Sequence, residues 1–508
     1  MPEILVIYPY ICKKIPRMKV QKWFHVSAII AALLLTGACK KEVSRSTGWE
    51  YNNSKNGGFE VRPFQDQGTG PGLLFIEGGT FTMGQTQDDV LYEWNNQPKR
   101  VTVTSFYMDQ TETRNMDYLE YLYWLARVYG ADYPGVYRKA LPDTLVWRDR
   151  LAYNEPLVEY YFRHPAYRNY PVVGVSWLQA NDYCAWRSDR VNEMLLIRKG
   201  ILSMDPAQKN ENNFNTETYL AGQYEGLVGK PMPDLNPNGT GTRKVKMEDG
   251  IMLPKYRLPT EAEWEFAALG LIGNTAYERI VEHKNYPWNG SYVRTNQSRY
   301  YGTFMDNFKR GKGDYMGVAG NLNDGADIPA ACGSYFPNDY GLYNMAGNVS
   351  EWVADVYRPL SFNDMSDIRP YRGNVFTTPV RDAEGFLSEK DSLGHLKYRP
   401  ITTAEAKDRK NYRQADNANY LDGDYQSNIN TEYWKDFTRD SSSTNLMYQY
   451  GVSSLISDKA RVYKGGSWKD QAYYLSPSMR RYLDETDASD AIGFRCAMTR
   501  VGGAIQGK

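Results

Sequence analysis

The distribution of apolar and polar residues predicts short strands in the first third of the chain. Val101, Val103 and Phe106 are interleaved with threonines, which indicates a half-buried strand with a period of two. In residues 75–84 the pair Gly78-Gly79 separates two β-prone runs. Glycine supplies the positive φ values that a tight turn requires, so this segment predicts a β-hairpin.

A helical period begins near residue 176. Ser176 and Gln179 have the spacing of a capping box, in which each side chain bonds the other residue's backbone N–H. Trp177, Ala180 and Cys184 then fall on one helical face. We therefore expect a helix that packs its apolar face on a sheet.

A second helical period begins near residue 260. Thr260 and Glu263 repeat the capping-box spacing, and Gly270 offers a helix stop. The apolar positions between them follow at i, i+3, i+4 and i+7: Trp264, Ala267, Ala268 and Leu271. Neither helix carries an obvious catalytic group. The pattern as a whole predicts an α+β fold of short strands, long loops and few helices.

The N-terminus has the layout of a secretory signal. Basic residues precede an apolar stretch at 26–35, which is too short to span a bilayer, and the sequence Leu-Thr-Gly-Ala-Cys ending at Cys39 resembles a bacterial lipobox. We expect residues 1–38 to be a signal peptide with its true start at Met18, Cys39 to be lipidated, and residues 39–71 to form a linker. An ordinary cleaved signal is the alternative.

Charge and composition narrow the class of partner. The chain has 60 basic and 60 acidic residues, so no basic excess exists to hold a nucleic acid backbone. Its 42 tyrosines combine apolar area with a polar tip, which suits a broad protein-binding surface. The abundance of tyrosine is equally compatible with a fold that is rich in aromatic residues and has no such binding surface.

Two polar stretches interrupt a single large domain that we place at 72–501, before a short tail at 502–508. Residues 205–249 are rich in Asn, Gly and Pro, and residues 360–459 are rich in Asp, Asn, Ser and Tyr. Connections of this length are usually functional or disordered. We interpret both as insertions, and the second as a partner-binding element or a surface loop.

Six short segments recur in an order that identifies a family resemblance. They lie at 75–84, 171–177, 256–265, 341–352, 464–468 and 493–495. In that order they resemble the formylglycine-generating-enzyme (sulfatase-modifying factor) family. The resemblance implies a formylglycine-generating-enzyme-like fold, related to C-type lectins and low in regular secondary structure.

The resembled enzymes oxidise a cysteine with molecular oxygen and hold copper(I) on two cysteines after the Gly-Gly-Ser turn. In this chain Asp470 and Leu475 occupy those two places. Copper(I) is soft and prefers thiolate, so neither residue is a suitable ligand. Histidines offer no replacement, because His164, His283 and His395 are widely scattered. We expect no enzymatic activity and no copper; an oxidase or other protein-modifying enzyme with a rebuilt site is the alternative.

The resemblance also implies structural calcium. Asn348 and Glu351 match one calcium loop of the family, and Asn296 with Asp324 corresponds to a second. Carboxylate, amide and carbonyl oxygens are the ligands that calcium requires. The alternative is that Asn348 and Glu351 bond backbone amides and stabilise the turn.

The positions of two cysteines suggest one disulfide bond. Cys184 and Cys496 match positions that form a disulfide in some members of the resembled family, and an oxidising periplasm would preserve such a bond. Two buried thiols are the alternative. Cys332 is left over and is expected to be a small buried hydrophobe.

Segments near the N-terminus resemble a narrower group. Residues 46–53, 56–59, 88–90 and 94–96 look like the GldJ family of gliding-motility lipoproteins, associated with type IX secretion; the related GldK family is the nearest competitor. This likeness implies a lipid-anchored structural or assembly component on the periplasmic side of the outer membrane, with GldK and GldN-type proteins as partners. A surface glycan-binding module is a third possibility, permitted by the lectin-like fold.

Overall fold

The chain forms two compact units. In the computed structural model, residues 42–85, 91–93, 95–281, 284–311, 326–357, 366–373, 377–402 and 459–502 are described. One unit combines the segment up to Pro63 with Pro233–Arg243, and the other contains the rest of the chain. Among the described residues no helix is both long and apolar enough to cross a lipid bilayer.

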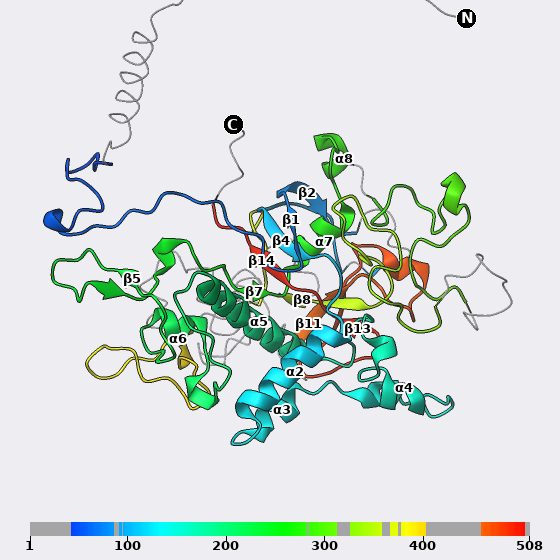
Figure 1. Cartoon of the computed structure of the whole chain (residues 1–508). Coiled ribbons are helices and arrows are strands. Elements are labelled where there is room, and N and C mark those ends of the chain that lie inside the picture. The colour runs from blue at the N-terminus through cyan, green and yellow to red at the C-terminus, as the bar shows by residue number, and fades with distance from the viewer. Residues whose placement is uncertain are drawn as a thin grey trace, which may run out of the picture. The chain divides into compact units, whose positions relative to one another are not determined.

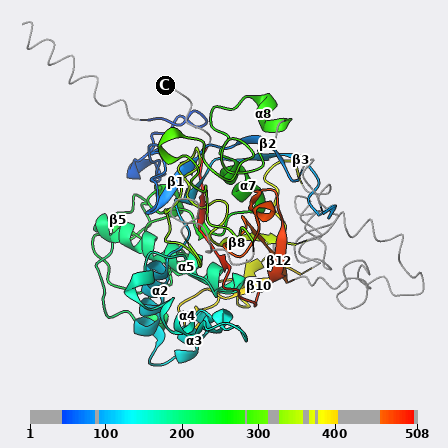
Figure 2. The ribbon, with the colours of Figure 1, turned by 90° about the vertical axis from the view of Figure 1, so that its right-hand side faces the viewer.

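Helices and strands alternate irregularly along the chain (Figures 1 and 2). The α-helices are α2 (Asn115–Tyr129), α3 (Pro134–Ala140), α4 (Glu155–Tyr160), α5 (Trp177–Arg198), α6 (Thr216–Leu220), α7 (Glu261–Leu269) and α8 (Ala276–Ile280). The first strands are β1 (Leu73–Ile76), β2 (Gly79–Met83), β3 (Lys99–Val103), β4 (Phe106–Asp109), β5 (Met232–Pro233), β6 (Thr242–Arg243) and β7 (Tyr256–Arg257). The later strands are β8 (Ser350–Val356), β9 (Thr377–Pro379), β10 (Tyr398–Pro400), β11 (Ala460–Lys464), β12 (Arg481–Asp484), β13 (Ile492–Gly493) and β14 (Ala497–Thr499). Helices and strands of this kind, without a repeating βαβ order, make an α+β fold.

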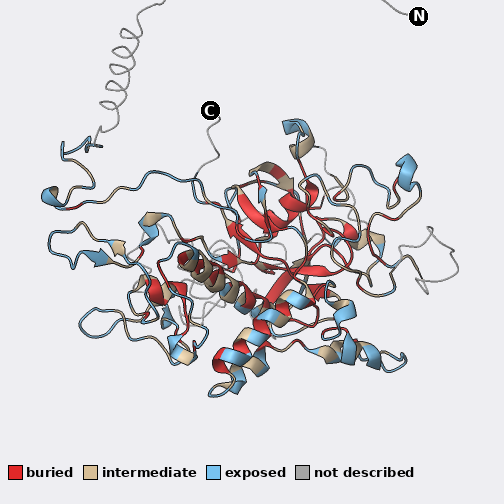
Figure 3. Ribbon diagram, viewed as in Figure 1, coloured by how far each residue is buried: buried red, intermediate tan, exposed pale blue. Residues whose placement is uncertain are grey.

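A four-stranded antiparallel sheet in the order β1-β4-β14-β7 lies in the interior of the larger unit. Successive side chains of a strand point to opposite faces. Tyr107 and Met498 accordingly join the apolar cluster that contains α2 and α5, whereas Met108 and Ala497 join the cluster that contains α7. Both faces are therefore buried, as the burial colouring in Figure 3 shows.

A second four-stranded sheet has the order β12-β11-β8-β13. Its strand β8 is buried at six of seven positions and pairs antiparallel with β11 and parallel with β13. Trp352 joins the α2–α5 cluster and Val353 the α7 cluster. Strand β8 therefore contributes to both cores, and β11 leads directly into the Gly-Gly-Ser turn.

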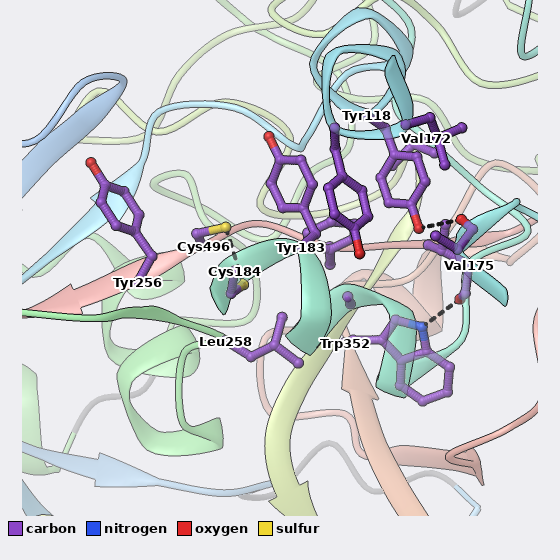
Figure 4. Packing of buried hydrophobic residues seen from close by; sticks show 14 of the residues in the cluster. Tyr118, Val172, Val175, Tyr183, Cys184, Tyr256, Leu258, Trp352 and Cys496 are labelled. Atoms are coloured by element: carbon purple, nitrogen blue, oxygen red, sulfur yellow. Dashed lines mark hydrogen bonds between the residues drawn. The ribbon is translucent and has the colours of Figure 1, made fainter. Parts of the chain in front are cut away.

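The first predicted helix is confirmed as α5. Ser176 Oγ accepts from the Gln179 N–H at 3.3 Å, and Gln179 Oε1 accepts from the Ser176 N–H at 2.9 Å, which completes the capping box. Ala180 and Cys184 are buried as expected, and the half-buried Trp177 donates its indole N–H to the carbonyl of Val353 at 2.8 Å. Figure 4 shows the neighbouring packing, in which Trp352 donates to the carbonyl of Val175.

The second predicted helix is confirmed as α7. Thr260 and Glu263 form the expected capping box, and Gly270 ends the helix with a φ of 57°. The helix is buried on every side, because all nine of its residues are buried, including three glutamates. It is therefore a core element, and each glutamate requires a partner in the interior.

The predicted hairpin at residues 75–84 is wrong. Strand β1 pairs with β4 and strand β2 pairs with β3, so the chain passes from one sheet to another at Gly78. A Cβ at Gly78 would lie 2.4 Å from the carbonyl oxygen of Val103 and 2.5 Å from the backbone nitrogen of Ser105. The glycine thus permits two chain segments to cross closely. The strand predicted through Phe106 also divides there, because Val101 and Val103 belong to β3 and Phe106 begins β4.

The part of the first insertion that belongs to the larger unit packs on the second insertion. An aromatic core of Phe214, Tyr219 and Tyr224 fills the first insertion. Thr218 of this insertion donates its hydroxyl to the carbonyl of Gly394 in the second at 2.8 Å. Residues 403–458 lie outside the described part of the chain.

The smaller unit contains much of the segment predicted as an N-terminal linker. Glu60 forms an ion pair with Arg243 at 2.5 Å and accepts from the Leu235 N–H at 3.2 Å. The hydrogen bond from Arg243 lowers the pKa of Glu60. Tyr51 and Phe59 add a ring contact with centroids 5.6 Å apart. This part of the linker is therefore folded against residues 233–243.

Candidate functional site

The turn after β11 is held in a left-handed backbone conformation. Gly465 and Gly466 have φ values of 98° and 70°. A Cβ at Gly466 would lie 2.7 Å from the carbonyl oxygen of Tyr474, and one at Gly465 would lie 2.9 Å from the ring of Trp264. Only glycine fits this close packing. The turn thereby fixes the following loop, which contains positions 470 and 475.

Asp470 forms an ion pair at the first position where the resembled enzymes have cysteine. Arg481 of β12 donates to both carboxylate oxygens, at 2.6 and 2.7 Å, and Ser467 donates its hydroxyl to Asp470 at 2.6 Å. Such two-point guanidinium–carboxylate contacts are strong and directional. Three donated hydrogen bonds therefore hold the Asp470 carboxylate.

Arg481 is itself held on several sides. It donates to Ser350 Oγ at 2.9 Å, and its guanidinium carbon lies 4.8 Å from the Tyr463 ring centroid and 4.9 Å from that of Tyr474. Burial by itself lowers the pKa of Arg481, but its hydrogen bonds to Asp470 and the charge of that residue outweigh this effect and raise the pKa. The guanidinium thus stays charged and matches the charge of Asp470.

Leu475, at the second cysteine position, belongs to the hydrophobic core. It is completely buried and packs in a cluster with Phe304, Phe308 and Ala346. An alkyl group has no lone pair to offer a metal. Together with the paired Asp470, it leaves this loop without the two soft donors that copper(I) requires.

A buried ion pair between Arg495 and Glu351 joins the segment before β14 to strand β8. Arg495 donates to both oxygens of Glu351, at 2.6 and 2.7 Å, and Glu351 also accepts from the Trp264 indole at 2.8 Å. The side chains of Arg495 and Glu351 are at most 1% exposed. Removing one partner of such a pair would leave an uncompensated charge in the interior.

Glu112 brings a second carboxylate to the same region. Asn344 donates to both of its oxygens, at 2.9 and 3.1 Å, and Asn348 donates to it at 2.8 Å. Burial raises the pKa of Glu112, and the charge of Arg495 only partly offsets this effect, while Glu351 adds to it. The sequence prediction missed Glu112 and Asn344. Asn344 lies inside the motif at 341–352, but Glu112 is distant in sequence and only the fold brings it there.

Asn348 and Glu351 by themselves do not fit a calcium ion. Asn348 Oδ1 accepts from the Ala330 N–H at 2.7 Å, and both oxygens of Glu351 accept from Arg495. Calcium needs oxygen atoms whose lone pairs face the ion. The oxygens of these two side chains face N–H donors instead.

The neighbouring side chains of Glu112 and Asn344 offer better ligands for a cation than Asn348 and Glu351 do. Asn344 Oδ1 is buried and has no hydrogen-bond partner among the described residues, and it lies beside Glu112. Two buried carboxylates near one guanidinium also leave an excess of negative charge. No group of three or more His, Cys, Asp or Glu side chains within the described ranges is placed to hold a metal, so backbone and amide oxygens would have to complete a calcium shell.

The other predicted site residues are separated from this cluster. Asn296 is exposed and, among the described residues, accepts a long contact, 3.5 Å, from the Tyr292 hydroxyl. Its predicted companion Asp324 and the predicted lipidation site Cys39 lie outside the described residues. The second calcium site and the lipid therefore stay predictions.

Cys184 of α5 and Cys496 before β14 are brought together. Both are buried, and their sulfurs lie 3.2 Å apart as two thiols (Figure 4). Burial raises the pKa of Cys184, which disfavours the thiolate that starts disulfide exchange. The fold thus places the predicted pair side by side, and the covalent bond stays a prediction. Cys332 is half-buried, with its sulfur 3.8 Å from the carbonyl oxygen of Glu112.

The fold and this loop describe an α+β domain with the Gly-Gly-Ser turn, followed by Asp470 and Leu475 at the positions where the resembled enzymes have cysteines. A family model for the sulfatase-modifying factor enzyme 1-like domain matches residues 59–399, more than half of the chain. The chain belongs to this formylglycine-generating-enzyme-like family.

Similar proteins include active and inactive members of this family. The chain is 25% identical to mouse formylglycine-generating enzyme over 299 residues, which is 56% of this chain and 58% of that protein. It is 24% identical to mouse inactive C-alpha-formylglycine-generating enzyme 2 over 321 residues, 60% of this chain and 73% of that protein. Among solved structures, PvdO from Pseudomonas aeruginosa is 16% identical and covers 84% of this chain and 94% of its own, with a TM-score of 0.40.

Proposed function

We propose that this chain is a non-catalytic, lipid-anchored component of the gliding-motility and type IX secretion apparatus, of the GldJ type. The observation that carries the loss of catalysis is the Asp470–Arg481 ion pair, with contacts of 2.6 and 2.7 Å, at a place where the resembled enzymes hold copper(I). Leu475 supports the same conclusion, because it is fully buried in an apolar cluster.

The family supports a non-catalytic role in general terms. One similar protein is named an inactive formylglycine-generating enzyme, so members without the oxidase activity exist. A fold that has lost its metal ligands still offers a large, rigid surface on which other proteins can bind. The particular role in gliding and secretion rests on the N-terminal resemblance to GldJ.

The proposed location is the outer membrane, on its periplasmic side, with the lipid on Cys39 as the anchor. One lipid chain alone gives only weak and reversible membrane binding, whereas several chains hold a protein stably. We therefore expect a multiply acylated N-terminal cysteine.

The proposal is tested by affinity purification of the full-length, lipidated protein from solubilised membranes of the native host. GldK and GldN-type proteins should be enriched over a control purification of an unrelated outer-membrane lipoprotein with the same tag. The variant Cys39→Ala should lose membrane association and most of this enrichment. If secretion components are absent from the wild-type sample at native expression level, the proposed function is wrong.

We further propose a structural calcium ion beside Glu112 and Asn344. Its chemistry would be the neutralisation of buried negative charge, without redox activity. Excess calcium at neutral pH should raise the melting temperature of the purified protein over a sample in EGTA, by several degrees at saturation. Glu112→Gln should abolish that difference, whereas Asn296→Ala should keep it. Equal melting temperatures with calcium and EGTA for the wild type would instead favour a proton on Glu112.

A further inference from the structure

The described part of the smaller unit begins close to the proposed lipid site. Glu42 is its first described residue, and Cys39 stands three positions before Glu42 in the sequence. Three residues of fully extended chain span at most about 11 Å. Lipid chains on Cys39 would therefore hold Glu42 within about 11 Å of the membrane headgroups.

A tight antiparallel hairpin follows this tether directly. The Ser44 N–H donates to the carbonyl of Trp49 at 2.8 Å, and the Tyr51 N–H donates to the carbonyl of Glu42 at 2.9 Å. Side chains two positions apart on an extended strand point to the same face, so Trp49 and Tyr51 share one face of the hairpin. Tyr51 also lies opposite Glu42, where the tether enters the unit. This face is therefore next to the tether.

Trp49, Tyr51 and Phe59 form an aromatic patch on the smaller unit. The rings of Tyr51 and Phe59 have centroids 5.6 Å apart. Trp49 is 58% exposed and Phe59 is 68% exposed. Exposure of large apolar rings to water is unfavourable, whereas aromatic side chains are favoured at the interface between a membrane and water.

The backbone around the patch is held in place. The Asn52 N–H donates to the carbonyl of Phe59 at 2.9 Å, which fixes Phe59 beside the hairpin. The adjacent Gly58 has a φ of 75°, and a Cβ there would lie 2.0 Å from the carbonyl oxygen of Leu235. This close packing joins the patch to residues 233–243. A folded patch loses little conformational entropy when it inserts into another phase.

The described part of the smaller unit has no excess of charge of either sign. It contains four acidic and four basic residues: Glu42, Glu50, Glu60 and Asp234 against Arg45, Lys55, Arg62 and Arg243. Attraction to anionic headgroups requires a cluster of basic residues. The aromatic rings are therefore the main source of affinity that the folded unit offers to a lipid surface.

We propose that the aromatic patch inserts into the headgroup region of the membrane that holds the lipid anchor. The proposal rests on the proposed lipidation of Cys39 and adds a second membrane contact to it. The short tether makes this bilayer the surface nearest to the patch. Two contacts, a lipid and a group of rings, would fix the orientation of the smaller unit on the membrane.

The test uses the mature chain, residues 39–508, with one myristoyl chain attached to Cys39 through a maleimide. A single chain of this length gives only weak, reversible binding, so a contribution from the patch can be measured. All samples contain Cys332→Ala, because Cys332 is half-buried while Cys184 and Cys496 are buried. Mass spectrometry verifies one label per chain. Co-flotation with phosphatidylcholine vesicles, with and without phosphatidylglycerol, then measures partitioning.

Variants of the patch should weaken this partitioning. Trp49→Ser and Phe59→Ser should each lower the partition coefficient by about 10-fold, as expected when one large aromatic side chain is no longer partly buried. The loss should be the same with and without phosphatidylglycerol. Phe386→Ser is the matched control, because Phe386 is 67% exposed but belongs to the larger unit. It should change partitioning by less than about 2-fold.

Circular dichroism establishes that each variant is folded before partitioning is compared. Folded Trp49→Ser and Phe59→Ser proteins that partition as the wild type does would overturn the proposal, and so would an equal loss in Phe386→Ser. Unchanged vesicle binding with a loss of GldK or GldN-type proteins from the membrane purification would assign the patch to a protein partner instead, and would also overturn it.

The outcome is separable from that of the proposed function. The lipid is attached chemically and no other protein is present, so failure on vesicles leaves the proposed role in secretion intact. Absence of acylated Cys39 in protein from the native host would refute the lipid anchor without changing the vesicle result.

Discussion

At the residue scale, Asp470 and Arg481 form a structural ion pair at a position where the resembled enzymes have cysteine. The two side chains are 17% and 22% exposed, so their attraction is stronger than that of a surface pair but is still screened in part. The ring of Tyr474 limits the positions open to the guanidinium. A hard carboxylate that is already paired with a cation is a poor ligand for a soft metal such as copper(I).

Restoring both cysteines should restore copper(I) binding. In Asp470→Cys/Leu475→Cys, Arg481 loses its carboxylate partner and its positive charge favours the thiolate form of a nearby cysteine. Competition with a colourimetric copper(I) chelator should detect tight binding in the double variant and not in either single variant. Tight binding by the wild type would contradict the lost-site interpretation.

Asp355 should make stability depend on pH. Its carboxylate accepts from the backbone N–H groups of Glu261 and Arg372 at 2.7 and 3.0 Å. Burial, together with the charge of Glu261, raises the pKa of Asp355 to about 7. The unfolded value is about 3.9, so the folded state binds this proton more tightly. The resulting stabilisation is complete below about pH 4 and is lost as the pH rises through 7.

Urea unfolding at pH 5 and pH 8 measures this dependence. The free energy of unfolding of the wild type should decrease by a few kcal/mol more between these pH values than that of Asp355→Asn. The exposed Asp149, changed to Asn, serves as the control and should behave as the wild type. Parallel pH dependence in the wild type and Asp355→Asn would show that Asp355 does not titrate in this range.

At the scale of elements, the capping boxes and the six motif segments made α5 and α7 predictable. Helix α2 was not predicted, although Tyr118, Tyr121, Leu122 and Leu125 have helical spacing and are buried. Its N-cap is Arg114, whose partner is Asp117. An arginine is not among the residues that usually mark a helix start, so the local start signal was missing.

Loss of the N-cap of α7 should lower the free energy of unfolding more than loss of the equivalent N-cap of α8. Thr260→Ala removes the hydroxyl that accepts from the Glu263 N–H, and α7 is buried throughout. We expect a loss of about 1 kcal/mol or more in the free energy of unfolding, measured by urea titration. Thr275→Ala removes the equivalent cap of α8, a short helix with no buried residue. That control should have little effect on global unfolding, and equal losses would contradict this view of α7.

At the scale of the whole molecule, segments distant in sequence form the core. Cys184 and Cys496 are separated by 312 positions, yet their sulfurs lie 3.2 Å apart. Closing so long a loop removes much entropy from the unfolded chain. A disulfide here would therefore stabilise the larger unit by linking α5 to the strand region before β14.

Mass spectrometry of the protein purified without reductant should find Cys184 linked to Cys496. Reduction should then lower the melting temperature, as expected for loss of about 2–4 kcal/mol. Cys332→Ala should leave both results unchanged. Free thiols at positions 184 and 496 after isolation from the periplasm would support the alternative of two buried thiols.

The sequence by itself determined the features that depend on near neighbours in the chain. The caps of α5 and α7 and the stop at Gly270 follow from local residue chemistry, and the resemblance of the motif segments located the glycine turn after β11 and the non-cysteine residues at positions 470 and 475. Capping and helix-stop signals involve only a few neighbouring residues, so the sequence predicts them without knowledge of the tertiary structure.

Only the tertiary structure decided which distant groups meet. The crossing at Gly78 separates β1 from β2, Arg481 neutralises Asp470, and Glu112 reaches Asn344 across 232 positions. Strand pairing and buried charge depend on contacts between segments far apart in the chain, which residue spacing does not specify.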